Sequence, residues 1–269
     1  MYNMSFFESF FAYIGRAYYW FLMILKNLGD FALFQTRLLP LYITRPYRIK
    51  ETMQQMVIAG IGSSGVIILT GTFTGMVEAV QLFQGFHEFG AENLMGYPIF
   101  ISIFRELGPV FAGLMLTSRA ISAMAAELGT MRVTEQIDAL DTLAVNSKKY
   151  LIIPRVIATT LSLPVLIIIF DAFGAVSAYL ISVHALGVNK TEFINTINMY
   201  LDLSDIFTGV LKGVVFGFLI GSIGTYIGYN AGGGAKGVGE ATTSAVVLGS
   251  ITVFVMDYFL SSLFLILGW

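Results

Sequence analysis

Five long apolar stretches constrain this chain more than any other feature of its sequence. They lie at about residues 53–83, 98–125, 152–183, 203–228 and 241–268. A helix needs roughly 20 apolar residues to cross the hydrocarbon core of a bilayer, so each stretch is long enough to span it. In lipid the backbone must satisfy its own hydrogen bonds, which favours helices. The predicted fold class is therefore an all-α integral membrane protein with five transmembrane helices.

The composition agrees with a membrane protein and excludes other classes. Only 12% of the residues are charged, against about 25% in a typical soluble domain. The mean hydropathy is +0.78. A net charge of −2 gives no basic surface, so we expect no nucleic-acid partner. The chain has no cysteine, which excludes disulfides and thiolate chemistry.

The distribution of basic residues predicts the orientation of the spans. Cytoplasmic loops carry more Lys and Arg than loops on the other side of a membrane. Basic residues gather before the first span and in the loops after the second and fourth spans, whereas the loops after the first and third hold only Lys190. We therefore expect the N-terminus in the cytoplasm and the C-terminus outside. The expected compartment is the bacterial inner (cytoplasmic) membrane, with an organelle envelope as the alternative.

Residues 1–50 form a separate N-terminal region that is rich in Phe, Tyr and Trp. Aromatic rings favour the headgroup level of a bilayer, which predicts an amphipathic helix lying in the cytoplasmic interface. The alternative is a sixth span over 10–34, and Lys26 and Asp30 argue against it. The expected domain division is thus an interfacial or elbow helix region at 1–50 and a five-helix transmembrane domain at 51–269.

A polar segment, Glu127 to Arg155, separates the second span from the third. Within it, Thr134 is predicted to cap a short cytoplasmic helix over about 134–146, whose first turn is acidic. Apolar residues recur at helical spacing and make one face of this helix. Helices that lie on membranes favour basic polar faces, so the acidic face indicates a protein partner. The residues predicted to dock that partner are Thr134, Glu135, Ile137, Asp138, Leu140 and Asp141.

Charged residues within the spans are costly, so each is a functional candidate. The run from Arg105 to Pro109 places two opposite charges where Pro109, which lacks an N–H, leaves the carbonyl of Arg105 without its helical partner. We expect a polar spot in a cavity that receives a lipid headgroup; an internal ion pair that locks two helices is the alternative. The predicted cavity residues are Arg105, Glu106, Leu107, Glu78 and Lys212.

Several finer points about these charges stay open at this stage. Lys212 could pair with Glu78 or with Glu106, and the sequence does not choose between them. Asp171 and Asp257 also fall within spans and are weaker candidates for contact with substrate. No catalytic residue and no metal site is predicted.

Glycines recur in two places. Gly209, Gly213, Gly217 and Gly221 form a row on one helix face. Small residues let helices approach closely in lipid, so this row predicts a packing seam, either within the chain or across a dimer. The glycine-rich loop at 232–237 lacks the GxxxxGK[ST] pattern and a preceding strand, so we expect no ATP binding by this chain.

The run ELGTMRVTEQIDAL (Glu127–Leu140) resembles the signature of the MlaE/YrbE permease family. The runs RELGPVFAGLMLTSRAISAMAAELG (Arg105–Gly129) and GVGEATTSAVV (Gly237–Val247) belong to the same resemblance, which covers roughly residues 50–269. It implies a non-enzymatic permease subunit of an ATP-driven ABC transporter. The cargo would be phospholipid or a similar lipid, exchanged between a membrane and an extracytoplasmic Mce-type lipid-binding protein.

The resemblance also implies partners. The helix at 134–146 would be the coupling helix seated on one of two ABC ATPase subunits, which bind the ATP, so this chain needs no cofactor. One docking helix per chain then implies a homodimer, and a small cytoplasmic accessory subunit is a further expected partner. From the residues alone, an ion-coupled secondary transporter of a hydrophobic or anionic substrate remains the alternative function.

Overall fold

The computed structural model describes residues 6–268, and every regular element in that range is a helix. Five of the described helices are long and apolar enough to cross a membrane: Ile49–His87, Gly96–Val133, Lys148–Ala185, Leu203–Tyr229 and Gly234–Leu267. The chain is an all-α integral membrane protein, as its apolar stretches predict. Most of the spans run beyond the predicted bounds, because polar residues at their ends continue the helices outside the apolar stretch.

Contacts divide the chain into two compact units, Met1–Pro46 and Tyr47–Trp269. In the first unit, α1 is one helix, Phe6–Ile43, with Pro40 inside its last turn. α1 is not among the five described helices that are long and apolar enough to cross a membrane. The interfacial position of this helix stays a prediction.

In the second unit, short helical turns interrupt the first two spans and form both ends of the third. The first span joins α2 (Ile49–Met56), η1 (Val57–Ile61) and α3 (Gly62–His87). The second joins α4 (Gly96–Ser102), η3 (Ile103–Leu107), α5 (Gly108–Leu116), η4 (Thr117–Ile121) and α6 (Ser122–Val133). The third joins η5 (Lys148–Ile152), α8 (Ile153–Leu180) and η6 (Ile181–Ala185). The turns inside these spans are π-helical, a form that is often found at functional sites.

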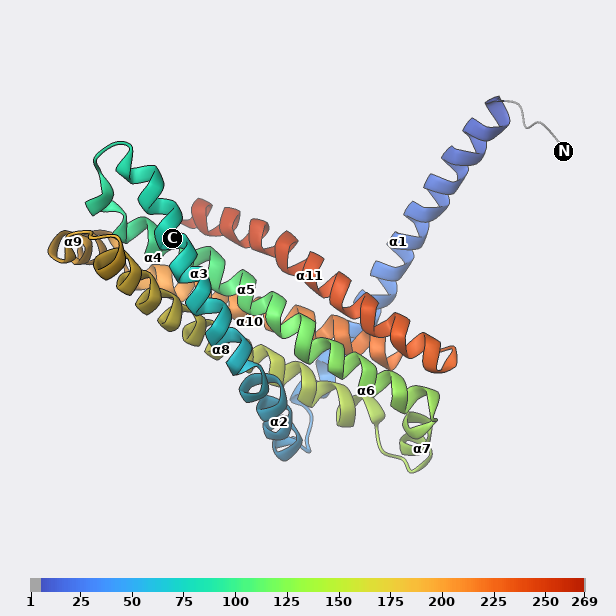
Figure 1. Ribbon diagram of the computed structural model, residues 1–269. Helices are drawn as coiled ribbons and strands as arrows, with labels where there is room; N and C mark the ends of the chain where they lie inside the picture. Colours follow the sequence, from blue (N-terminus) through green and yellow to red (C-terminus); the bar gives the residue numbers. More distant parts are fainter. Residues whose placement is uncertain (1–5, 269) are drawn as a thin grey trace. The chain divides into compact units, whose positions relative to one another are not determined.

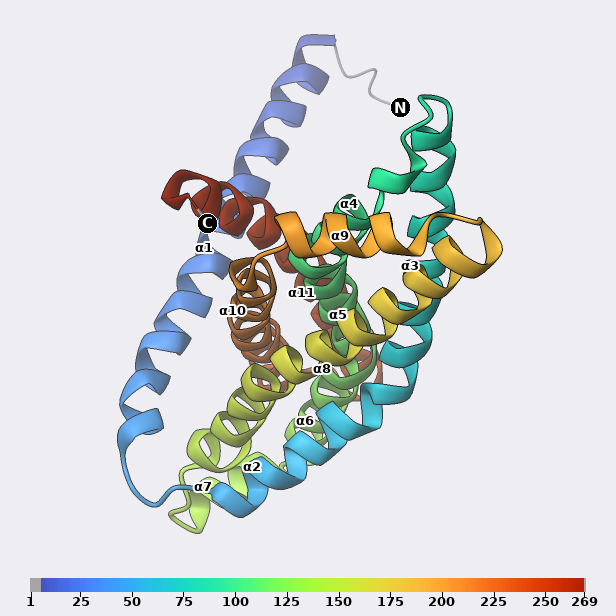
Figure 2. The ribbon, with the colours of Figure 1, turned by 90° about the vertical axis from the view of Figure 1, so that its left-hand side faces the viewer.

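The last two spans are α10 (Leu203–Tyr229) and α11 (Gly234–Leu267). Shorter helices connect the spans: η2 (Glu92–Leu94), α7 (Gln136–Thr142) and α9 (Lys190–Tyr200). In the second unit, α2 and α7 lie at one end of the bundle and α4 and α9 at the other (Figures 1 and 2). Connections between successive spans must alternate between the two ends of the bundle, and the positions of these four helices agree with that alternation.

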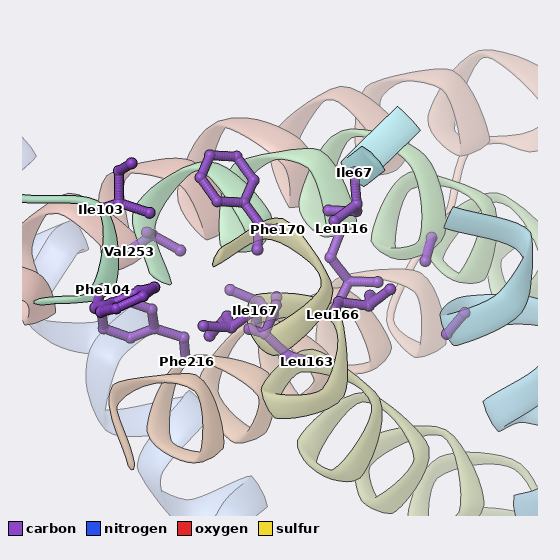
Figure 3. Close-up of a cluster of buried hydrophobic side chains, with 14 of the residues drawn as sticks. Ile67, Ile103, Phe104, Leu116, Leu163, Leu166, Ile167, Phe170, Phe216 and Val253 are labelled. Carbon is purple, nitrogen blue, oxygen red and sulfur yellow. The ribbon is translucent and has the colours of Figure 1, made fainter. Parts of the chain in front are cut away.

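The core of the second unit forms around α8, which packs against both α3 and α10. Figure 3 shows Leu163, Ile167 and Phe170 of α8 among buried side chains of neighbouring helices. The outer helices are far less covered: 50% of the apolar window of α10 is buried, against 11% for α11 and 22% for the first span. α3 and α11 therefore present broad apolar faces to lipid or to another protein.

The glycine row of α10 lies within the chain and not at a dimer contact. Gly217 packs against the backbone of Thr159 and Thr160 on α8, where a Cβ would come within 2.6 Å of the Thr159 carbonyl oxygen. Gly209 faces the carbonyl oxygen of Phe104 so closely that a Cβ would collide with it. Of the two alternatives that the sequence left open, the seam within the chain is the one observed.

The predicted coupling helix is wrong in its bounds and in its cap. Thr134 is the C-cap of α6, where the backbone leaves the helical conformation, and its hydroxyl donates to the carbonyl oxygen of Thr130 at 2.8 Å. The N-cap of α7 is Glu135, in the left-handed conformation with φ of 60° and without a side-chain cap bond. The helix covers only Gln136–Thr142, and Ala144 follows it with φ of 58°. Local propensity placed the cap one residue early because the preceding span continues to Val133.

The left-handed Glu135 leads to a test of stability. A non-glycine residue in this conformation costs roughly 1 kcal/mol, so Glu135→Gly is expected to raise the free energy of unfolding by about that amount. Thermal unfolding of the detergent-extracted protein should show a higher midpoint. The control is Ala139→Gly in the exposed middle of α7, which should lower the midpoint because glycine weakens a helix interior. Equal effects at the two positions would contradict the assigned backbone conformation.

Candidate functional site

A fully buried lysine forms the centre of the polar site. Lys212 lies in α10 with a side-chain exposure of 0%. Its Nζ donates to Glu106 Oε2 at 2.7 Å and to Asp257 Oδ1 at 2.9 Å. It also lies 2.8 Å from Ser261 Oγ and 2.8 Å from the carbonyl oxygen of Arg105. We name this set, together with Asp205, the Lys212 cluster; it joins the second, fourth and fifth spans.

The proline of the second span explains why the lysine reaches a backbone oxygen. Pro109 has no N–H, so the carbonyl of Arg105 cannot make its usual bond along the helix. The turn before it, η3, is π-helical. Lys212 Nζ donates a hydrogen bond to the carbonyl oxygen of Arg105, which Pro109 leaves without a helical donor. The loosened turn that the sequence predicts is therefore present, and its free acceptor is satisfied by a side chain from α10.

Arg105 is held from another side by the start of α10. Its Nε donates to Asp205 Oδ1 at 2.6 Å, and the Asp205 side chain is only 6% exposed. Asp205 also accepts the backbone N–H of Asp202 at 2.9 Å, as part of the capping box that begins α10. The start of α10 thus holds the Asp205 carboxylate in position, and that carboxylate in turn orients the Arg105 guanidinium.

The cluster can be reached through two of its charged side chains. Glu106 is 45% exposed and Arg105 is 26% exposed, whereas Lys212 is inaccessible. Ser261 Oγ donates to Glu106 Oε1 at 3.1 Å and restrains the exposed carboxylate. The arrangement presents one anionic and one cationic group, side by side, at the edge of an otherwise apolar bundle.

The structure chooses between the pairings that the sequence left open. Lys212 pairs with Glu106 and Asp257, and among the described residues no ion pair joins it to Glu78, so the Glu78–Lys212 alternative is wrong. Leu107 is half-buried and packs against the hydrophobic core. Glu78 and Leu107 therefore stay outside the Lys212 cluster, and their place in a lipid cavity remains a prediction.

Sequence reasoning missed three members of the cluster or gave them too little weight. Asp205 and Ser261 were not considered, and Asp257 was only a weak candidate. Asp205 lies seven residues before Lys212, and Asp257 lies four before Ser261, so each pair shares a helix face. That spacing was the available signal.

Asp171 of α8 presents a different case. It is buried, and neither carboxylate oxygen has a hydrogen-bond partner among the described residues. It lies against Gly108, where a Cβ would collide with Oδ1. The glycine after the π-helical turn thus makes room for a carboxyl group from the third span.

At the other end of the bundle, the apolar face of α7 points into the protein. Ile137 is fully buried with Leu128 and Leu151, and Leu140 packs against the same cluster. The expectation that Ile137 and Leu140 form the docking face is therefore corrected: they attach α7 to its own bundle. A short helix without other support needs this packing.

The exposed surface of α7 consists of different residues. Glu135 and Asp138 are exposed, and Asp138 pairs with Arg132 at 2.7 Å. Asp141 Oδ1 accepts the backbone N–H of Ser147 at 3.1 Å, which holds the end of the loop. Leu143 is 74% exposed and adds an apolar side chain to this surface.

A polar groove adjoins this surface. It has a volume of about 470 Å³ and runs between the start of α7 and the loop before α11. Its lining residues are Arg132, Val133, Glu135, Asp138, Asn230, Ala231, Gly232, Gly233 and Gly234. The groove and Leu143 together offer both polar and apolar contacts to a partner.

Comparison with known proteins identifies the family. The family model described as "Permease MlaE" matches residues 52–263, which includes both the Lys212 cluster and α7. The chain belongs to the MlaE permease family. It is an ABC transporter permease, and the resemblance read from the sequence motifs is confirmed.

Relatives of this MlaE family permease occur in bacteria and in a plant. A probable ABC transporter permease protein of Rickettsia typhi is 42% identical over 238 residues, covering 88% of this chain and 92% of the relative. The intermembrane phospholipid transport system permease protein MlaE of Haemophilus influenzae is 35% identical, covering 78% and 81%. The chloroplastic protein TRIGALACTOSYLDIACYLGLYCEROL 1 of Arabidopsis thaliana is 40% identical, covering 80% and 61%.

Proposed function

We propose that this permease moves phospholipid, or a similar lipid, between its membrane and an extracytoplasmic Mce-type lipid-binding protein, driven by ATP hydrolysis on partner subunits. The observation that carries the proposal is the Lys212 cluster, which exposes Arg105 and Glu106 at the edge of apolar spans. The Haemophilus relative is named for phospholipid transport, which agrees with this cargo.

The chemistry of the cluster suits a lipid headgroup. A guanidinium binds phosphate oxygens strongly, so Arg105 would contact the phosphate. Glu106 would contact a headgroup amine where one is present, or hold Arg105 in place. The exposed apolar faces of α3 and α11 would receive the acyl chains. Binding at this site would couple the lipid to three spans at once.

The proposed assembly follows from α7. Each chain offers one such helix, and two ABC ATPase subunits need two docking points, so a homodimer is proposed. α7 would face the cytoplasm of a bacterium, with the protein in the inner membrane, the N-terminus in the cytoplasm and the C-terminus outside. ATP would bind to the ATPases, and a small accessory subunit would complete the cytoplasmic side.

A substitution at the exposed leucine tests the docking. Leu143→Asp is expected to lower the amount of ATPase that co-purifies by about tenfold, because it removes an exposed apolar contact at an interface. The protein should remain folded, since Leu143 is 74% exposed. The matched control is Met199→Asp, at a residue that is 76% exposed on α9 at the opposite end of the bundle. Normal ATPase recovery with Leu143→Asp would refute the docking surface.

The energy source separates this function from an ion-coupled secondary transporter. Lipid transfer from proteoliposomes that hold the complete complex should require ATP and should persist when the proton gradient is collapsed. Glu106→Gln should retain the ATPase and lose most lipid transfer. Transfer that follows the gradient and ignores ATP would favour the secondary transporter.

A further inference from the structure

A second cationic site lies far from the Lys212 cluster, at Arg119. This residue is at the centre of the π-helical turn η4, and its side chain is exposed on the surface of the second span. Its Nη1 lies 3.2 Å from Ser63 Oγ and 3.4 Å from the carbonyl oxygen of Ile58, both on the first span. The contacts are long and neutral, so they compensate the charge weakly.

No carboxylate of the described residues lies within 4.0 Å of Arg119, whereas Arg105, Arg132 and Arg155 each contact one. The acids nearest to it in sequence on its own span are Glu127, eight residues away, and Glu106, thirteen away. At 1.5 Å per residue these lie about 12 Å and about 20 Å along the helix. A cation within a membrane span without a counter-charge is a functional candidate.

The backbone around Arg119 is shaped to hold its guanidinium. Gly62 lies directly beneath it, and a Cβ there would come within 2.7 Å of Nη1. Both helices are π-helical at this level, in η1 and in η4. Nε and Nη2 have no hydrogen-bond partner among the described residues, so donors remain for a ligand.

An apolar groove adjoins the same place. It is an open hollow along one face of the first span and shares Ile58 with the guanidinium contacts. Its lining residues are Lys50, Met53, Gln54, Gln55, Val57 and Ile58. Lys50 lies eight residues before Ile58, so a second cation stands about 12 Å along the helix, towards the α2 end.

We propose that Arg119 is a second lipid site, which binds the phosphate of a phospholipid in the half of the membrane that contains α2. The groove from Lys50 to Ile58 receives its acyl chains. Lys50 contacts the headgroup of a lipid in its ordinary position at the membrane surface. Arg119 binds the phosphate of the same lipid after the headgroup has moved deeper into the leaflet. This inference rests on the proposed function in taking phospholipid as the cargo, and it adds an entry or exit route on the α2 side.

A second copy of the chain is a poorer occupant than a lipid. Gly249 of α11 packs against Thr117, which places residue 249 near the level of Arg119. The acids of α11 are Glu240 and Asp257, nine and eight residues from Gly249, or about 12–14 Å. Between Gly62 and Val77 the first span has no acid. These exposed helices of a partner copy therefore offer no carboxylate at the required depth.

Photo-crosslinking tests this site. A photoreactive residue is placed at Ile58 of the full chain, in cells labelled with radioactive phosphate, and labelled lipid attached to the protein is measured. The parent protein should capture lipid, and Arg119→Gln should lower capture about tenfold, because a charge-assisted hydrogen bond to phosphate is lost. Arg119→Lys should retain part of the capture. The control Ser118→Ala changes an exposed hydroxyl that bonds only within its own helix, to Met115, and should have no effect.

Two further positions make each outcome decisive. Capture from Tyr258, an exposed residue next to Asp257 of the Lys212 cluster, should be unchanged by Arg119→Gln. Capture from Ile168, an exposed residue of α8, reports bulk lipid. Capture at Ile58 that is independent of Arg119, or no greater than at Ile168, overturns the proposal, as does a crosslink to a second copy. The proposed function can fail separately. If the parent protein binds no ATPase or transfers lipid without ATP, the proposed function is refuted. If capture at Ile58 still depends on Arg119 in that case, the phosphate site stands.

Discussion

Lys212→Met is expected to lower the free energy of unfolding by about 3–5 kcal/mol, because it removes one partner of a buried ionic network. The substitution leaves Glu106 and Asp257 without their common cation and the carbonyl of Arg105 without a donor. Unfolding of the detergent-extracted protein by heat or denaturant measures the change. Lipid transfer should be lost as well, because the exposed carboxylate is no longer held.

A double-mutant cycle separates this network effect from simple loss of packing. Glu106→Gln removes one charge that Lys212 compensates, so Glu106→Gln and Lys212→Met together should cost less than the sum of the two. Additive effects would show that Glu106 and Lys212 act independently, which contradicts the 2.7 Å contact. Glu192→Gln on α9 serves as a distant reference. Its effect on the free energy of unfolding should simply add to that of Lys212→Met.

Gly217→Leu is expected to have the second largest effect, a loss of about 3 kcal/mol, because it forces a side chain into closely packed backbone. A Cβ at this position would lie 2.6 Å from the Thr159 carbonyl oxygen and 2.9 Å from the Thr160 Cα. Backbone cannot move aside as a flexible side chain can, so α10 and α8 must separate. Thermal unfolding should show the loss, and the protein should become more sensitive to proteolysis.

The matched control is Gly239→Leu in α11. No heavy atom lies within 4 Å of a Cβ placed there, so the new side chain meets no neighbour. Because leucine favours a helix more than glycine does, stability should stay level or rise by up to about 1 kcal/mol. The two substitutions are chemically identical, so an equal loss at both positions would show that the seam is not where the structure places it.

The sequence was sufficient for the class of protein and for the count of spans, because hydropathy and helix length are local properties of the chain. It was also sufficient for the loosened turn, since Pro109 removes a backbone donor in any helix that contains it. The ends of the spans were less predictable. α6 continues to Val133 through polar residues, so α7 begins later than predicted and has Glu135 as its N-cap.

The rotation of each helix about its axis was beyond local reasoning. The apolar face of α7 could equally have met a partner, and only the burial of Ile137 shows that it packs inward. That inward packing leaves Leu143 exposed, although both residues belong to the same apolar pattern. Amphipathic spacing defines a face, whereas the packing of neighbouring helices decides what covers it.

The sequence by itself determined that this protein is a five-span permease with scarce charges at marked positions, and its motifs determined the family. Only the tertiary structure decided which of those charges meet. Glu106 and Lys212 are 106 residues apart, and their contact depends on the packing of two helices. It also showed that no carboxylate of the described residues lies within 4.0 Å of Arg119, whereas Arg105 contacts Asp205. Hydropathy depends on each residue and its neighbours in the chain, whereas compensation of a charge depends on distances that only the folded bundle sets.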